Sequence, residues 1–85
     1  MERDKAIVTL RMPQRNRSVD LEVPLNITAN ELIIALNSAY DLGINVNDVQ
    51  SCYMTAVEPI ILLRGNRTLA EFGVRNGTVL EYTKR

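Results

Sequence analysis

The sequence predicts an α+β fold in which one main helix and one short helical turn pack against a mixed β-sheet. Two strand-like segments come first, an amphipathic helix follows, and three more strand-like segments complete the chain. Because only one long segment has helical periodicity, a single helix must cover the apolar face of the sheet. Residues 1–85 are expected to form one domain, since no linker, repeat or low-complexity stretch divides them.

The first two strands are expected to form a hairpin. Residues 5–11 are rich in β-forming side chains, and residues 18–23 alternate between apolar and polar ones. The loop at residues 12–17 contains Pro13 and Asn16, which are common in turns. The side chains expected to face the helix from these two strands are Val8, Leu10, Val19, Leu21 and Val23.

The main helix is expected to run from about residue 29 to residue 42. Thr28 and Glu31 have the spacing of a capping box, in which each side chain bonds the backbone N–H of the other residue. Gly43 is expected to end the helix in the left-handed conformation. Ile34 lies opposite the apolar stripe and is expected to face solvent or a partner. The stripe consists of Ala29, Leu32, Ile33, Leu36, Ala39 and Tyr40.

The second half of the chain is expected to supply three strands, at residues 50–57, 60–63 and 79–82. Turns are expected at residues 65–66 and 76–77, with a short helical turn carrying Leu69 and Phe72 between them. The orientation of the strand at residues 50–57 stays open, because both of its faces carry side chains that can pack. One face has Cys52, Met54 and Ala56, and the other has Tyr53, Thr55 and Val57.

The sequence predicts no catalytic, cofactor-binding or metal-binding residue. Histidine is absent, Cys52 is the single cysteine, and the four glycines are isolated, so no common catalytic, zinc-binding or phosphate-binding pattern is present. Cys52 is expected to be a small core residue, and Asp20 and Glu22 the solvated side of a strand. No apolar run is long enough to span a bilayer and no signal peptide is recognisable, which favours a cytoplasmic location.

Charge is segregated along the chain although the net charge is zero. Residues 18–60 contain six acidic residues and no Lys or Arg, so the middle of the chain is expected to form an acidic surface that orients a partner. Arg11, Arg15 and Arg17 at the predicted hairpin are candidates for phosphate contacts. A neutral chain with only 5% aromatic residues is nevertheless a poor match for a nucleic-acid-binding protein, so no nucleic acid partner is expected.

With this order of elements, the chain resembles ubiquitin over nearly its whole length. The strand at residues 19–23 is followed by the capping Thr28, and Leu32 and Leu36 stand at helix core positions. The end of the chain repeats the ubiquitin-like closing pattern with Leu69, Phe72, Val74, Leu80 and Tyr82. Within the ubiquitin-like β-grasp proteins it is most similar to the small accessory proteins of bacterial type VII secretion loci, the YukD/EsaB type, on residues 19–24 and 76–81.

This resemblance implies a non-catalytic, cytoplasmic accessory protein that works by protein contacts and supports a membrane-bound machine exporting small helical-hairpin substrates. The expected partners are components of that secretion machine, and no cofactor is implied. One alternative is a ubiquitin-like adaptor of an unrelated complex. Another is a modifier or sulfur carrier, against which the sequence shows Thr83-Lys84-Arg85 at its end and no Gly-Gly pair.

Two surfaces are candidates for partner binding. On the outer face of the sheet, Ile7, Arg11 and Val79 are expected to point away from the helix, with Ile7 and Val79 on adjacent strands. On the exposed side of the helix, Ile34 lies near the acidic Glu31. Because exposed sheet edges can pair between copies, a monomer or a weak dimer is expected.

Overall fold

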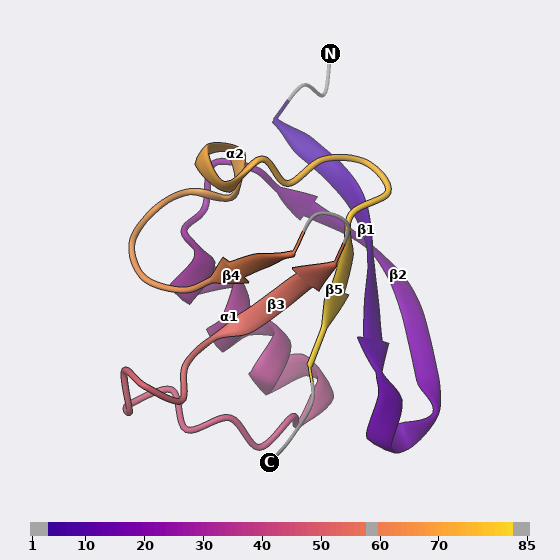
Figure 1. Ribbon diagram of the computed structural model, residues 1–85, viewed down its shortest axis with the longest axis vertical. Coiled ribbons are helices and arrows are strands. Elements are labelled where there is room, and N and C mark those ends of the chain that lie inside the picture. The colour runs from indigo at the N-terminus through magenta and orange to yellow at the C-terminus, as the bar shows by residue number, and fades with distance from the viewer. Residues whose placement is uncertain (1–3, 58–59, 83–85) are drawn as a thin grey trace.

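The computed structural model describes residues 4–57 and 60–82, which form a five-stranded mixed sheet with one long helix across one face (Figure 1). The strands lie in the order β2-β1-β5-β3-β4, and β5 pairs in parallel with β1 at the centre. This arrangement confirms the α+β fold that the sequence predicted. The elements, in chain order, are β1 (Lys5–Met12), the 3-10 turn η1 (Pro13–Arg15), β2 (Arg17–Pro24), α1 (Ala29–Tyr40), β3 (Met54–Val57), β4 (Ile61–Leu63), α2 (Leu69–Phe72) and β5 (Val79–Glu81).

The hydrophobic core lies between α1 and the inner face of the sheet. Leu10 and Leu80 are register partners on β1 and β5, and both are fully buried beneath the helix. Val19 and Leu21 on β2 are half-buried, because β2 is an edge strand that the helix covers only in part. The prediction of which side chains of the first two strands face the helix is therefore confirmed. The remaining large, fully buried side chains are Val8, Ile33, Met54, Leu63 and Leu69.

Helix α1 begins as predicted but ends earlier. Thr28 accepts a hydrogen bond from the Glu31 N–H at 3.1 Å, and the Glu31 carboxylate accepts one from the Thr28 N–H at 2.9 Å. The helix stops at Tyr40, because Asp41 takes the left-handed conformation with φ 51°, two residues before Gly43. The expected end at residue 42 was wrong.

Side chains from outside the last turn explain this early end. The Arg15 guanidinium donates hydrogen bonds to the backbone oxygens of Tyr40 and Asp41, which satisfies carbonyls that a continuing helix would use itself. The Asn37 side chain accepts from the Ile44 N–H and donates to the Ile44 carbonyl, which holds the exit loop against the helix. Ala39, expected in the buried stripe, is exposed.

The third strand is shorter than predicted, because a turn occupies its expected first half. Asp48 accepts hydrogen bonds from the Gln50 N–H at 3.0 Å and from the Ser51 hydroxyl at 2.9 Å. Such aspartate-centred turns compete with strand pairing. Strand β3 therefore starts only at Met54, and β4 and β5 are each one residue shorter than expected.

The open orientation of β3 is settled by the burial of its side chains. Met54 and Ala56 are buried together with Cys52, whereas Thr55 and Val57 are half-buried on the outer face. The short helix α2 begins with a second capping box, between Thr68 and Glu71, and it ends at Gly73 with φ 84°. The expected helical turn with Leu69 and Phe72 is thus confirmed.

Candidate protein-interaction surface

The outer face of the sheet, which Figure 1 shows in front of α1, can be mapped from the strand register. One row across the strands joins Asp20, Thr9, Val79 and Val57. The next row joins Ser18, Arg11, Glu81, Thr55 and Leu62. Above the first row, Ile7 on β1 lies opposite Glu22 on β2. The outer face is thus acidic along β2 and uncharged along β3 and β4.

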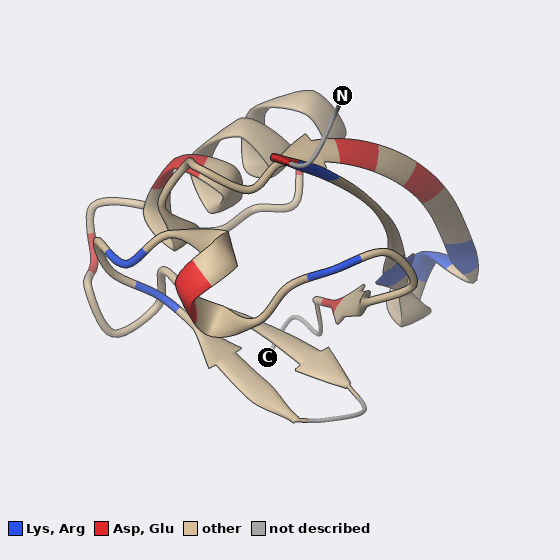
Figure 2. Ribbon diagram, turned by 90° about the horizontal axis from the view of Figure 1, so that it is seen from above, with Lys and Arg blue, Asp and Glu red and all other residues tan. Residues whose placement is uncertain are grey.

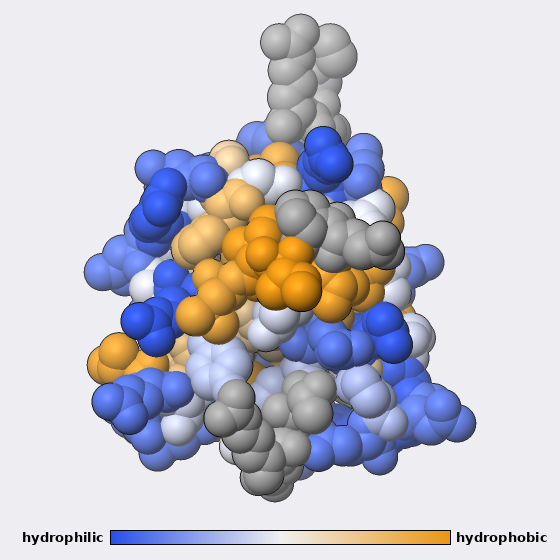
Figure 3. Space-filling view, viewed as in Figure 1, coloured by the Kyte–Doolittle hydropathy of each residue, from blue (hydrophilic) through white to orange (hydrophobic). Residues whose placement is uncertain are grey.

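Apolar side chains gather on this face into what we call the outer-face patch, defined by Ile7, Val57, Ile60, Leu62 and Val79. Ile7 is 55% exposed, Leu62 48% and Ile60, immediately before β4, 82%. Val57 and Val79 are half-buried register partners that link the two sides. Figure 3 shows a continuous hydrophobic area at the centre of this face of the molecule.

Polar groups next to the outer-face patch are mostly paired with each other. Arg11 and Glu81 form an ion pair at 3.4 Å on adjacent strands. The Thr9 hydroxyl donates to Asp20 at 2.8 Å. Glu22 makes no ion pair or side-chain hydrogen bond with the described residues. The carboxylates of Asp20 and Glu22 on β2 thus lie beside the outer-face patch without an ion-pair partner among the described residues.

The structure brings three of the predicted binding residues together and separates the other two. Ile7, Arg11 and Val79 share the outer face as expected, whereas Glu31 and Ile34 lie on α1, behind the sheet. Ile34 is 47% exposed, but the exposed residues beside it on the helix are Glu31, Ala35 and Ser38, so it has no large apolar neighbour there. The Glu31 carboxylate is engaged in the capping box, so it stabilises the helix start.

Sequence reasoning missed Val57, Ile60 and Leu62. The run at residues 60–63 contains four aliphatic residues, so no alternation shows which of them point outward. The pairing of β4 with β3 fixes this phase, because Leu62 lies opposite the outward Thr55. Only the register of a neighbouring strand could have revealed these residues.

The acidic residues do not form the single surface that the charge pattern predicted. Figure 2 shows those on β2 and at the start of α1 on different sides of the molecule. Glu31 caps α1, and Glu71, outside residues 18–60, caps α2 in the same way. Hydrogen bonds from Thr68 lower the pKa of Glu71, with a smaller contribution from Arg67, so this carboxylate stays charged to lower pH than an ordinary glutamate.

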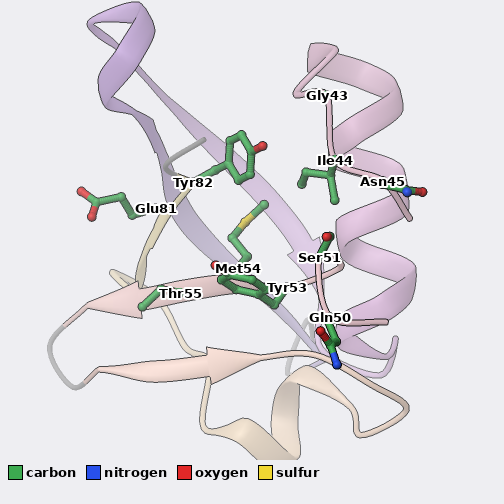
Figure 4. A pocket seen from close by; sticks show the side chains of 10 residues that line it. All are labelled: Gly43, Ile44, Asn45, Gln50, Ser51, Tyr53, Met54, Thr55, Glu81 and Tyr82. Carbon is green, nitrogen blue, oxygen red and sulfur yellow. The ribbon is translucent and has the colours of Figure 1, made fainter. Parts of the chain in front are cut away.

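A cavity of about 520 Å³ lies beside the end of β5, between β3 and the loop that follows α1 (Figure 4). Tyr53, Met54 and Tyr82 line it together with amide and hydroxyl groups of the loop. Burial raises the pKa of the Tyr82 phenol, with Tyr53 adding to the effect, so the phenol stays protonated at neutral pH. Glu81 also lines the cavity but is paired with Arg11. These groups offer polar contacts and no activated nucleophile.

Cys52 does not provide a reactive thiol. Its side chain is buried, and its sulfur lies 3.6 Å from the Asn30 side-chain oxygen. Burial raises the pKa of the Cys52 thiol, which keeps it in the unreactive neutral form. Within residues 4–57 and 60–82, no three potential ligands come together to hold a metal ion.

Residues 6–81 match the family model described as "WXG100 protein secretion system (Wss), protein YukD". The chain belongs to the YukD family. This match confirms the resemblance to the YukD/EsaB type. Of the helices in the described ranges, none has the length and apolar character needed to cross a bilayer. A search of curated proteins found no significant match.

Solved structures similar to this YukD-family chain share its ubiquitin-like fold. The C-terminal ubiquitin-like domain of mouse tubulin-specific chaperone E is 12% identical, with a TM-score of 0.69 over 96% of this chain and 90% of that one. The UBL domain of Plasmodium falciparum Dsk2 is 16% identical, with a TM-score of 0.63 over 93% and 99% of the two chains. A de novo protein designed on ubiquitin is 19% identical, with a TM-score of 0.65 over 98% and 92%. At these identities the likeness shows the β-grasp fold alone.

Proposed function

We propose that this YukD-family chain is a non-catalytic, cytoplasmic accessory protein of a WXG100 secretion system, and that it acts by binding a protein partner through the outer-face patch. The family match supports the secretion context. The single observation that carries the binding role is the contiguity of Ile7, Val57, Ile60, Leu62 and Val79 on one face of the sheet.

Contiguity matters because single exposed apolar residues are common on protein surfaces, whereas joined ones mark interaction sites. The outer-face patch draws on β1, β3, β5 and the start of β4, so no single local sequence feature accounts for it. Covering apolar surface contributes about 25 cal/mol per Å² before the costs of association, so joined apolar residues supply more binding energy than scattered ones.

The non-catalytic part of the proposal is supported by the chemistry of the described side chains. The Cys52 thiol is buried and neutral, and the Tyr82 phenol is held protonated. The carboxylates of Glu31 and Glu71 bond backbone N–H groups of helix caps. The hydroxyls of Thr9 and Ser51 donate to the carboxylates of Asp20 and Asp48, and the sequence contains no histidine, the commonest general base.

The proposed partner is a cytoplasmic segment of a membrane component of the secretion machine. The test is capture of the machine's purified components on the immobilised chain, with matched acidic substitutions at three surfaces. Leu62→Glu changes the outer-face patch, Ile34→Glu changes the exposed side of α1, and Val49→Glu changes a loop residue that is 80% exposed. Circular dichroism checks that each variant is folded.

We expect Leu62→Glu to reduce capture at least tenfold, because it places a carboxylate in a desolvated apolar contact. Val49→Glu is expected to leave capture unchanged. Loss of capture with Ile34→Glu and retention with Leu62→Glu would place binding on α1 and refute the proposed surface. If no component of the machine is captured, the proposed accessory role fails.

A further inference from the structure

We infer that the partner element that binds the outer-face patch is an amphipathic helix of about 15 residues, with Lys or Arg at the end that lies over β2. The inference rests on the proposed function, because it specifies what the outer-face patch binds. Its basis is the lateral order of side chains across the sheet, from acidic on β2 to apolar on β3 and β4.

The dimensions of the sheet match those of a helix lying across the strands. Neighbouring strands are about 4.8 Å apart, so the five strands span about 19 Å. A helix advances about 1.5 Å per residue, so one strand spacing corresponds to about three residues. Residues at i, i+3, i+7, i+10 and i+14 on one side of the helix would then lie over β2, β1, β5, β3 and β4 in turn.

Each of these positions meets a different chemistry on the outer face. Position i lies over the carboxylates of Asp20 and Glu22 on β2. The next position meets Ile7, and the two after it meet Val79 and Val57. The last position meets Leu62 and Ile60. A basic residue followed by four apolar ones at helical spacing is the complementary pattern.

The other charged residues near the outer-face patch leave β2 as its acidic side. Arg11 and Glu81 neutralise each other in their ion pair. Lys5 also lies on the outer face, two residues before Ile7 and opposite Pro24, and Arg75 lies in the loop that precedes β5. Strands β3 and β4 carry no charged residue. On the β2 side of the outer-face patch, the two carboxylates of Asp20 and Glu22 therefore outnumber the single ammonium group of Lys5.

A helix fits this face better than an extended segment does. The face of a sheet offers side chains but no free backbone groups, so a partner lying on it must satisfy its own N–H and C=O groups. A helix does so internally, whereas an extended segment needs a sheet edge. The edges here are a poor template, since β4 has three residues and β2 carries charged side chains.

A second copy of the chain fits less well than a helix. A stable interface between two folded proteins buries about 800 Å² on each partner, more than the few hundred Å² of a typical surface patch. A single helix needs only the width of the sheet. Two copies would also bring no basic row to face Asp20 and Glu22, because these residues lie beside the outer-face patch in both copies.

The test is a selection of displayed random 15-residue segments on the immobilised full chain, with removal of segments that also bind the Leu62→Glu variant. We expect enrichment of segments with Lys or Arg at one end and apolar residues at i+3, i+7 and i+10. Synthetic peptides of the enriched segments should become helical on binding, as measured by circular dichroism. Their affinity should fall at least threefold with Asp20→Asn/Glu22→Gln, which keeps the hydrogen-bonding shape and removes the charge.

Enrichment of acidic segments, or of segments that alternate with a period of two, would overturn the inference. The absence of any enriched segment would also overturn it. These failures are distinct from failure of the proposed function, because capture of secretion components could still depend on Leu62. If the selected peptides behave as expected but capture is insensitive to Leu62→Glu, the proposed function fails instead.

Discussion

The outer face of the sheet and the exposed side of α1 each carry an exposed isoleucine and a glutamate, but the surroundings of these residues differ. Ile7 and Ile34 are 55% and 47% exposed, so exposure alone does not distinguish them. Ile7 lies in a group of apolar side chains, whereas the exposed neighbours of Ile34 on the helix are Glu31, Ala35 and Ser38. The Glu22 carboxylate makes no hydrogen bond or ion pair with the described residues, whereas the Glu31 carboxylate bonds the Thr28 N–H. The proposed binding surface therefore differs from the exposed side of α1 in the contiguity of its apolar residues and in its unpaired carboxylate.

The largest expected effect is a difference in the free energy of unfolding between substitutions on the two faces of β4. Leu63 is fully buried and Leu62, next to it, points to the outer face. Leu63→Ala should lower the free energy of unfolding by about 2–5 kcal/mol, because it leaves a cavity in the core. Leu62→Ala should cost less than about 1 kcal/mol, because its side chain is already half in water. Urea denaturation measures both, and an equal loss would show that Leu62 is part of the core.

The next effect concerns the two exposed isoleucines and partner binding. Ile7→Glu should weaken binding of the captured secretion component at least tenfold, which corresponds to about 1.4 kcal/mol. Ile34→Glu should change it less than twofold, because Ile34 has no other large exposed apolar residue on α1 with which to form an interface. Titration calorimetry with folded variants is the measurement. The reverse result would move the interface to α1.

A smaller effect distinguishes the capping box of α1, which stabilises the fold, from the carboxylates on β2, which are proposed to bind the partner. Thr28→Ala should destabilise the chain by about 1 kcal/mol through loss of the α1 cap, and it should leave partner affinity unchanged. Asp20→Asn/Glu22→Gln should do the opposite, with little change in thermal stability and a loss of affinity that shrinks at high salt. A stability loss in the second variant would give those acids a structural role.

The cap of α2 gives a pH dependence with a defined sign. Because the pKa of Glu71 is lowered in the folded state, its stabilising effect is present above the ordinary carboxyl pKa and is lost as the pH falls through the lower folded value. Glu71→Gln should therefore reduce stability at pH 7, and the difference from wild type should vanish at strongly acidic pH. Urea midpoints at pH 7 and pH 2.5 test this. A difference that persists in acid would contradict the assigned cause.

The smallest effect is expected at the exposed ion pair. Arg11→Ala should change stability by less than about 1 kcal/mol, because surface pairs contribute little. It should alter partner binding less than threefold, since the pair lies beside the outer-face patch and is neutral. A large loss of binding would make Arg11 a direct contact.

The sequence predicted the elements whose signals are local. The capping box of Thr28 and Glu31 and the alternation of β2 depend on residues close together in the chain, and both are present in the structure. The predictions of element boundaries were wrong where side chains outside the local pattern determine where an element begins or ends. Arg15, from the hairpin, ends α1 before Gly43. Asp48 draws residues 50 and 51 into a turn, a competition that strand propensity does not include.

The candidate surface was only partly predictable for the same reason. Ile7 and Val79 could be placed on the outer face because their strands alternate clearly. Val57 and Leu62 come from segments where both faces carry apolar residues, and only the pairing of β3 with β5 and β4 sets their direction. The outer-face patch depends on how neighbouring strands pair, and the sequence of one strand does not determine that pairing.

The most direct test of binding through the outer face is a methyl NMR titration of the labelled chain with the captured secretion component. The methyl signals of Ile7, Val57, Ile60, Leu62 and Val79 should shift or broaden together as the component is added. Those of Ile34 and Val49 should stay in place. Changes confined to Ile34 and its neighbours on α1, with the outer-face signals unmoved, would contradict the account.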